Sequence, residues 1–108
     1  MLTNSDMADI VLSLGGDPDN STNVRQLEVM LDALKIYFER NEARKDLWMT
    51  DTLDESAMHC ISKAKRIQNA PYDEKSVDDG LDLINYTVFF LRNRAAVVAV
   101  GDLMGPPS

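Results

Sequence analysis

Apolar residues along this chain recur at intervals of three and four, which is the spacing that one face of an α-helix requires. No segment alternates between apolar and polar residues over a length that predicts a half-buried β-strand. The helical pattern appears in four stretches, and we expect helices at about 5–14, 23–44, 52–70 and 77–100. Four helices with short connections predict a single all-α domain over 1–108 with a four-helix bundle-like architecture.

Capping and turn residues mark the expected ends of these helices. Three helix starts have a side-chain cap and a reciprocal partner three residues later: Asn23 with Gln26, Thr52 with Glu55, and Ser76 with Asp79. The expected helix ends lie at Gly15, before Pro71 and at Gly101, because glycine and proline interrupt helices. Residues 1–20 would then form a short helix and a loop, and 102–108 a flexible tail.

The last predicted helix is apolar on more than one side. One stripe runs along it at helical spacing, and further large apolar residues such as Leu83, Phe90 and Val97 lie off this stripe. A single chain of this size has too few other helices to cover both faces, so we expect a homodimer or a higher homo-oligomer. The stripe consists of Leu81, Ile84, Val88, Leu91 and Ala95.

Composition narrows the class of protein. The chain has 108 residues, of which 44% are hydrophobic, so one domain with a core is the expected size. A formal net charge of −7 argues against direct binding to a nucleic-acid backbone. The single cysteine, Cys60, excludes an internal disulfide. The first residues lack the features of a signal peptide, and no apolar run is long enough to cross a bilayer, so we expect a cytoplasmic protein without membrane contact.

Two acidic pairs predict a metal site. Asp79 and Asp82 lie three residues apart on one helix face, Asn85 follows a turn later, and the positions around them are apolar. Buried carboxylates are costly unless a cation meets them. Glu39 and Glu42 repeat this spacing near the end of the second helix, and oxygen ligands suit Mg²⁺, so all four are candidate magnesium ligands. The alternatives are complementarity to a helix dipole for Asp79 and a solvated, ion-paired face for the glutamates.

Basic and aromatic residues supply further candidates. Lys63 and Arg66 lie one turn apart on the third helix, where they would suit a triphosphate next to a metal. Trp48 is the only tryptophan, and its ring could stack on a base. The alternatives are dipole complementarity in a last helical turn for the basic pair and a core or interface anchor for the tryptophan.

These motifs resemble a known family. The runs 61–67 and 78–86 have the form of a Lys-x-x-Arg helix followed by an Asp-x-x-Asn-Tyr helix, and the segments 38–41 and 46–48 extend the likeness over about 27–91. This pattern resembles the nucleotide-modification-associated domain of type 1, which is common in bacteriophages and similar to the MazG-like all-α nucleotide pyrophosphohydrolases.

The resemblance implies an ExxE pair and an ExxD pair that hold Mg²⁺ on a nucleoside triphosphate. Glu39 and Glu42 match the first pair, and Asp79 and Asp82 match the second, with aspartate at 79 where the relatives have glutamate. Lys63 and Arg66 would then be catalytic, while Trp48, Asn85 and Tyr86 would contact the nucleotide.

Three hypotheses follow. The first is a magnesium-dependent nucleotide-binding protein that hydrolyses a nucleoside or deoxynucleoside triphosphate to the monophosphate and pyrophosphate, in the host cytoplasm if a phage encodes it. The second is a non-catalytic viral regulatory protein that sequesters a nucleotide or binds a host protein. The third is an interaction bundle whose polar helix ends carry no site.

Overall fold

The computed structural model describes the backbone of residues 2–103 and the side chains of residues 2–99. In this range the chain forms four α-helices and a 3-10 helix, and no strand. The all-α prediction is therefore confirmed. The elements in chain order are α1 (Asn4–Ser13), α2 (Ser21–Arg44), η1 (Leu47–Thr50), α3 (Leu53–Asn69) and α4 (Lys75–Leu103).

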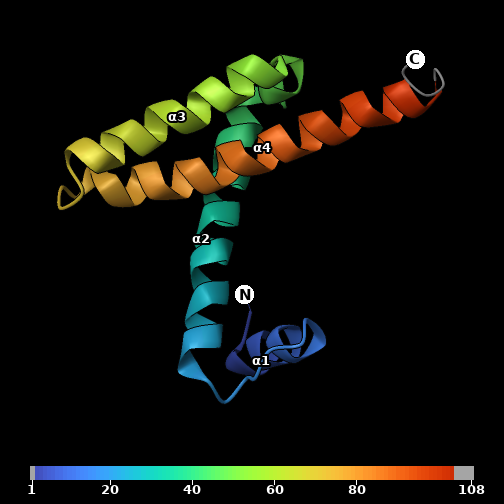
Figure 1. The fold of residues 1–108 in the computed structure, drawn as a ribbon. Helices are drawn as coiled ribbons and strands as arrows, with labels where there is room; N and C mark the ends of the chain where they lie inside the picture. Colours follow the sequence, from blue (N-terminus) through green and yellow to red (C-terminus); the bar gives the residue numbers. More distant parts are fainter. Residues whose placement is uncertain (1, 104–108) are drawn as a thin grey trace.

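The helices form an open arrangement (Figure 1). α3 and α4 lie side by side and antiparallel, α2 crosses them and continues away as a stalk, and α1 packs at the far end of α2. The radius of gyration is 16.9 Å, whereas a compact chain of this length has about 13 Å. The architecture is bundle-like where α2, α3 and α4 meet, and the rest of α2 extends away from this region as a stalk.

Local side-chain chemistry fixes several helix ends where the sequence predicts them. Thr52 caps α3 and Glu55 returns the hydrogen bond, so the predicted capping box is confirmed. α3 ends at Asn69, before Pro71, as expected. Gly15 follows α1 with a φ of 91°, which glycine adopts without steric cost.

A second capping box begins α1, between Thr3 and Asp6. The backbone N–H of Thr3 donates to the carboxylate of Asp6, and this hydrogen bond lowers the pKa of Asp6 below its ordinary value of 3.8.

Two predicted caps are wrong. The N-cap of α2 is Asn20, whose side chain accepts a hydrogen bond from the N–H of Thr22 at 2.9 Å. Asn23 lies inside α2, where its side-chain amide donates to the carbonyl of Asp17 at 3.1 Å. The hydroxyl of Ser76 likewise donates to the carbonyl of Pro71 at 2.9 Å instead of capping α4.

The expected end of α4 at Gly101 is also wrong, because the helix continues to Leu103. Residues 102 and 103 are therefore helical, and the rest of the predicted tail, residues 104–108, lies outside the described residues. A single glycine costs a helix only about 1 kcal/mol, which the neighbouring helical residues can offset.

The buried interior is small and largely polar. Among the described residues, the buried side chains are Val11, Ala33, Ser56, Asp79 and Asp82. No described helix is both long enough and apolar enough to cross a bilayer.

α4 turns buried polar side chains, as well as the rings of Tyr86 and Phe89, to the other helices. Asp79, Asp82 and Asn93 face inward, where they contact α2, α3 or η1. The predicted apolar stripe faces the other way, and its members Val88 and Leu91 are exposed. One chain therefore leaves part of the apolar surface of α4 uncovered, as expected, and the uncovered part belongs to the predicted stripe.

Candidate ligand-binding site

A ladder of polar contacts joins α3 to α4. At one end, the amide of Asn93 donates to the hydroxyl of Ser56 at 3.3 Å and to the backbone carbonyl of Trp48 at 3.1 Å. In the middle, the rings of His59 and Tyr86 stack with their centroids 5.0 Å apart. The other end of the ladder consists of ion pairs.

These ion pairs centre on Asp82, which is only 6% exposed. Its carboxylate pairs with Arg40 of α2, and its Oδ2 lies 3.1 Å from the Nζ of Lys63 on α3. Lys63 also approaches Asp79 at 3.4 Å, and Arg66 lies 3.8 Å from the same carboxylate. Burying a carboxylate is tolerable only when cations and hydrogen-bond donors meet it. The cations next to these carboxylates are side chains of the same chain, namely Arg40, Lys63 and Arg66.

The four predicted metal ligands are not gathered into one set. Asp79 and Asp82 lie together, but Glu39 and Glu42 are exposed on α2. Arg40 pairs with Asp82 of α4, although both glutamates are its near neighbours in sequence. In the described part of the chain, no three His, Cys, Asp or Glu side chains are placed to hold a metal ion together. The donor set thus fits magnesium incompletely, and magnesium remains a prediction.

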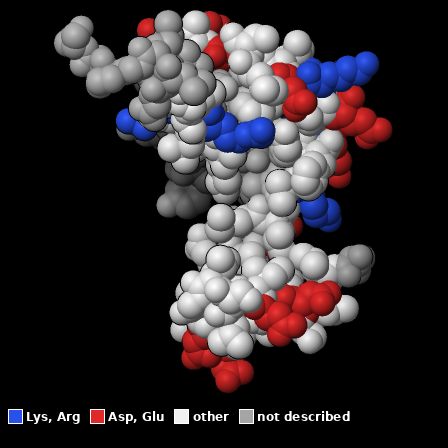
Figure 2. All heavy atoms as spheres, turned by 90° about the vertical axis from the view of Figure 1, so that its right-hand side faces the viewer, with Lys and Arg blue, Asp and Glu red and all other residues white. Residues whose placement is uncertain are grey.

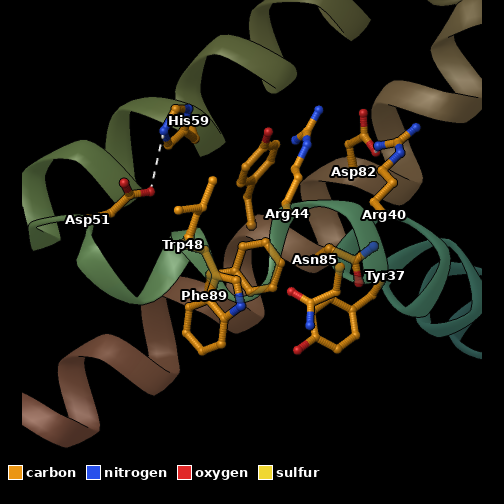
Figure 3. Close-up of a pocket in the computed structure, with 12 residues that line it drawn as sticks. Tyr37, Arg40, Arg44, Trp48, Asp51, His59, Asp82, Asn85 and Phe89 are labelled. Atoms are coloured by element: carbon orange, nitrogen blue, oxygen red, sulfur yellow. Dashed lines mark hydrogen bonds and ion pairs between the residues drawn. The ribbon is translucent and has the colours of Figure 1, made fainter.

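A pocket opens next to the Arg40–Asp82 pair, at the crossing of α2 and α4 (Figure 3). Its volume is about 380 Å³, within the range of small-molecule sites. α2, η1, α3 and α4 all contribute to its walls. The lining residues are Tyr37, Arg40, Asn41, Arg44, Leu47, Trp48, Asp51, His59, Asp82, Asn85, Tyr86 and Phe89.

Aromatic rings form one side of this pocket. Trp48 stacks on Phe89 with the ring centroids 4.7 Å apart and the planes at 10°. Tyr86 meets Phe89 edge-on at 5.8 Å, and Tyr37 lies 5.6 Å from it in a tilted arrangement. The guanidinium of Arg92 lies 4.2 Å from the centre of the Trp48 ring. The indole N–H of Trp48 is buried and has no acceptor among the described residues.

Cationic groups lie near these rings. Arg40 and Arg44, one turn apart on α2, extend to the same side of the pocket in Figure 3. His59 stands at the other end, where its Nε2 is 3.5 Å from Asp51 and forms an ion pair when the ring is protonated. Asn85 donates its amide N–H to the carbonyl of Ala33 at 2.9 Å, which leaves its carbonyl oxygen as an acceptor.

The fold brings together some of the residues singled out in the sequence. Trp48, Asn85 and Tyr86, the predicted nucleotide contacts, all line this pocket. The predicted catalytic pair, Lys63 and Arg66, lies behind it and contacts the acidic side chains of α4.

Sequence reasoning missed several pocket residues. On α2, the sequence spacing could have identified them, because four pocket residues recur at intervals of three, one and three and so share one helix face. These are Tyr37, Arg40, Asn41 and Arg44. Phe89 and His59 carry no such signal, because only the pairing of α3 with α4 brings them to the pocket.

Comparison of this chain with models of protein families, with curated proteins and with solved structures finds no match. The structure alone therefore gives its class: it is an all-α protein with a pocket lined by aromatic rings and arginines. The likeness to nucleotide pyrophosphohydrolases stays a prediction.

Proposed function

We propose that this protein binds a nucleoside phosphate in the pocket between α2 and α4. The observation that carries the proposal is the meeting of stacked aromatic rings with two arginines one turn apart in a single cavity. A nucleotide has the complementary parts, a flat base and an anionic phosphate chain.

The aromatic side would hold the base. A base stacked on an aromatic side chain gains roughly 1–3 kcal/mol, whichever base it is. Tyr86 and Phe89 are held by their own ring contacts, so a ligand would meet rings that are already ordered. The oxygen of Asn85 is an acceptor for an amino group on the base.

The arginines would hold the phosphates. Guanidinium groups bind phosphate through paired, charge-assisted hydrogen bonds. An acidic chain of net charge −7 repels an anion at long range, so binding depends on local cations such as Arg40 and Arg44. Asp82 is an internal competitor for Arg40, since a phosphate that recruits this arginine takes it from the carboxylate.

Magnesium-dependent hydrolysis to the monophosphate and pyrophosphate is the reaction that the family resemblance implies. Asp79 and Asp82 are the residues that would hold a metal ion, but each already has cationic partners on α2 or α3. Binding without turnover, as in a protein that sequesters a nucleotide, needs only the pocket. Release of pyrophosphate with Mg²⁺ present distinguishes the two outcomes.

Titration with ATP and with each deoxynucleoside triphosphate, with and without Mg²⁺, tests the proposal. The single tryptophan lines the pocket, so its fluorescence reports binding directly, and calorimetry gives the affinity. We expect Arg44→Ala to weaken binding about tenfold or more, because a hydrogen bond between charged groups contributes about 1.5–3 kcal/mol.

Arg25→Ala is the matched control, since it removes an exposed arginine from the opposite end of α2, where it pairs with Glu28. Its affinity should equal that of the unchanged chain. Equal losses in both variants would reduce the effect to net charge. No binding of any nucleotide would defeat the proposal and leave a protein partner as the alternative for this surface.

A further inference from the structure

An apolar seam runs along the outward face of α4. Its members alternate at intervals of four and three residues, and three of them, Val88, Leu91 and Val98, are 43%, 56% and 45% exposed. This spacing over three heptads is that of a helix that pairs with another helix in a coiled coil. The seam consists of Val77, Leu81, Ile84, Val88, Leu91, Ala95 and Val98.

The seam lies on the opposite side of α4 from the contacts that hold this chain together. The inward residues include Asp79, Asp82 and Asn93, which bond to α2, α3 and η1, and the rings of Tyr86 and Phe89, which stack on His59 and Trp48. A surface helix normally turns one apolar stripe to the interior and a polar face to water. α4 has apolar residues on both faces, so a second apolar surface is needed to cover the seam.

The length of the seam sets the size of the surface that it can bury. Each partner contributes roughly 600–1000 Å² to a standard interface. The 22 residues from Val77 to Val98 extend for about 33 Å, long enough to supply such an interface.

We propose that the seam of α4 pairs with the same seam of a second copy of this chain. Charge favours an antiparallel pair. The exposed acidic residue beside the seam, Asp78, lies near its N-terminal end, and Arg92 and Arg94 lie toward its C-terminal end. Antiparallel pairing places acid against base at both ends, whereas parallel pairing places like charges together. This proposal is independent of what the pocket binds.

The mass in solution tests the pairing. Sedimentation equilibrium over the micromolar range should give twice the chain mass of 12.1 kDa. The double variant Val88→Glu with Leu91→Glu should be a monomer. As these side chains are exposed, the variant keeps its helix content, which circular dichroism checks. The control, Met58→Glu with Tyr72→Glu, adds the same charge at exposed apolar positions off the seam and should stay dimeric.

A monomer at every concentration would overturn the proposal and indicate a different macromolecule as the partner. A dimer that survives the seam substitutions, or that the control disrupts equally, would overturn it too. The unchanged chain gives a further check that needs no variant, since the unfolding temperature of a dimer rises with protein concentration.

The orientation has its own test. In a Cys60→Ser background, chains with Ile84→Cys and chains with Val88→Cys are mixed and oxidised. Antiparallel pairing brings position 84 opposite position 88 of the second copy, so the mixed disulfide should dominate. A preponderance of the two symmetric disulfides would overturn the antiparallel arrangement.

Discussion

At the scale of single residues, the buried carboxylate of Asp82 forms two ion pairs. It belongs to α4, and its two cationic partners belong to two other helices, Arg40 on α2 and Lys63 on α3. One carboxylate therefore links three helices. Removing one member of such a buried set leaves the others without a counter-charge, which costs more than the set as a whole contributes.

We expect Asp82→Ala to lower the free energy of unfolding by about 2–3 kcal/mol, a little below the range for fully buried pairs because Arg40 is half exposed. Combining Asp82→Leu with Arg40→Met should recover part of the loss, because both members of this ion pair are then removed while Lys63 keeps Asp79 as its partner. Urea denaturation measures both variants. Asp32→Ala is the exposed control and should change stability by less than about 0.5 kcal/mol. Equal effects of Asp82→Ala and the control would show that the three-helix pairing does not form.

At the scale of elements, the turn between α2 and η1 positions the tryptophan wall of the pocket. Lys45 and Asp46 both have positive φ, at 49° and 61°. Asn41 secures this turn, since its amide exchanges two hydrogen bonds with Asp46, at 2.8 and 3.0 Å. The turn directs the chain into η1, where Trp48 reaches Phe89.

Lys45→Gly should raise the free energy of unfolding by about 0.5–1 kcal/mol. Glycine takes the left-handed conformation at a helix C-terminus without the steric cost that lysine incurs. Asp46→Gly relieves the same kind of backbone cost but loses the hydrogen bonds that Asn41 and Tyr37 donate to the carboxylate, so it should not stabilise. Thermal unfolding of the two variants measures the difference. A gain for Asp46→Gly as large as for Lys45→Gly would mean that these bonds contribute nothing.

The presence of the helices and several of their ends can be predicted from the sequence, because they depend on residues that are close together in the chain. Thr52 with Glu55 and the stop before Pro71 are of this kind. Asn20 and Asn23 are both residue types that cap helices; Asn20 caps α2, and Asn23 instead donates to Asp17. The spacing of α4 predicts a helix, but it does not determine which side faces inward, because both sides carry apolar residues.

At the scale of the whole molecule, the predicted contacts at the site differ in origin. Trp48, Asn85 and Tyr86 were recognised through local motifs and share one pocket. The bond between Arg40 and Asp82 joins residues 42 apart in sequence, and it exists only because α2 crosses α4 at that point. No periodicity encodes this crossing, so the partner of Asp82 could not be predicted.

The open shape predicts uneven stability along the chain. α1 lies at the far end of the stalk and buries one side chain, Val11 (Figure 1). Figure 2 shows this lower lobe joined to the rest of the molecule by a narrow waist. We expect amide hydrogens of α1 to exchange with solvent well before those in the paired part of α3 and α4, because fewer contacts must open. Exchange measured by mass spectrometry checks this order. Equal protection throughout would indicate a single cooperative unit.

The polar ladder between α3 and α4 also limits how these helices can align. Sliding one helix along the other by a turn, about 5.4 Å, would separate Asn93 from Ser56 and Asp82 from Lys63 at the same time. A purely apolar contact between two helices would tolerate such slippage, because one methyl group replaces another. The donors and acceptors between α3 and α4 would instead lose their partners. The antiparallel pair of α3 and α4 therefore has one alignment that satisfies its polar groups, and misaligned forms should be too costly to accumulate during folding.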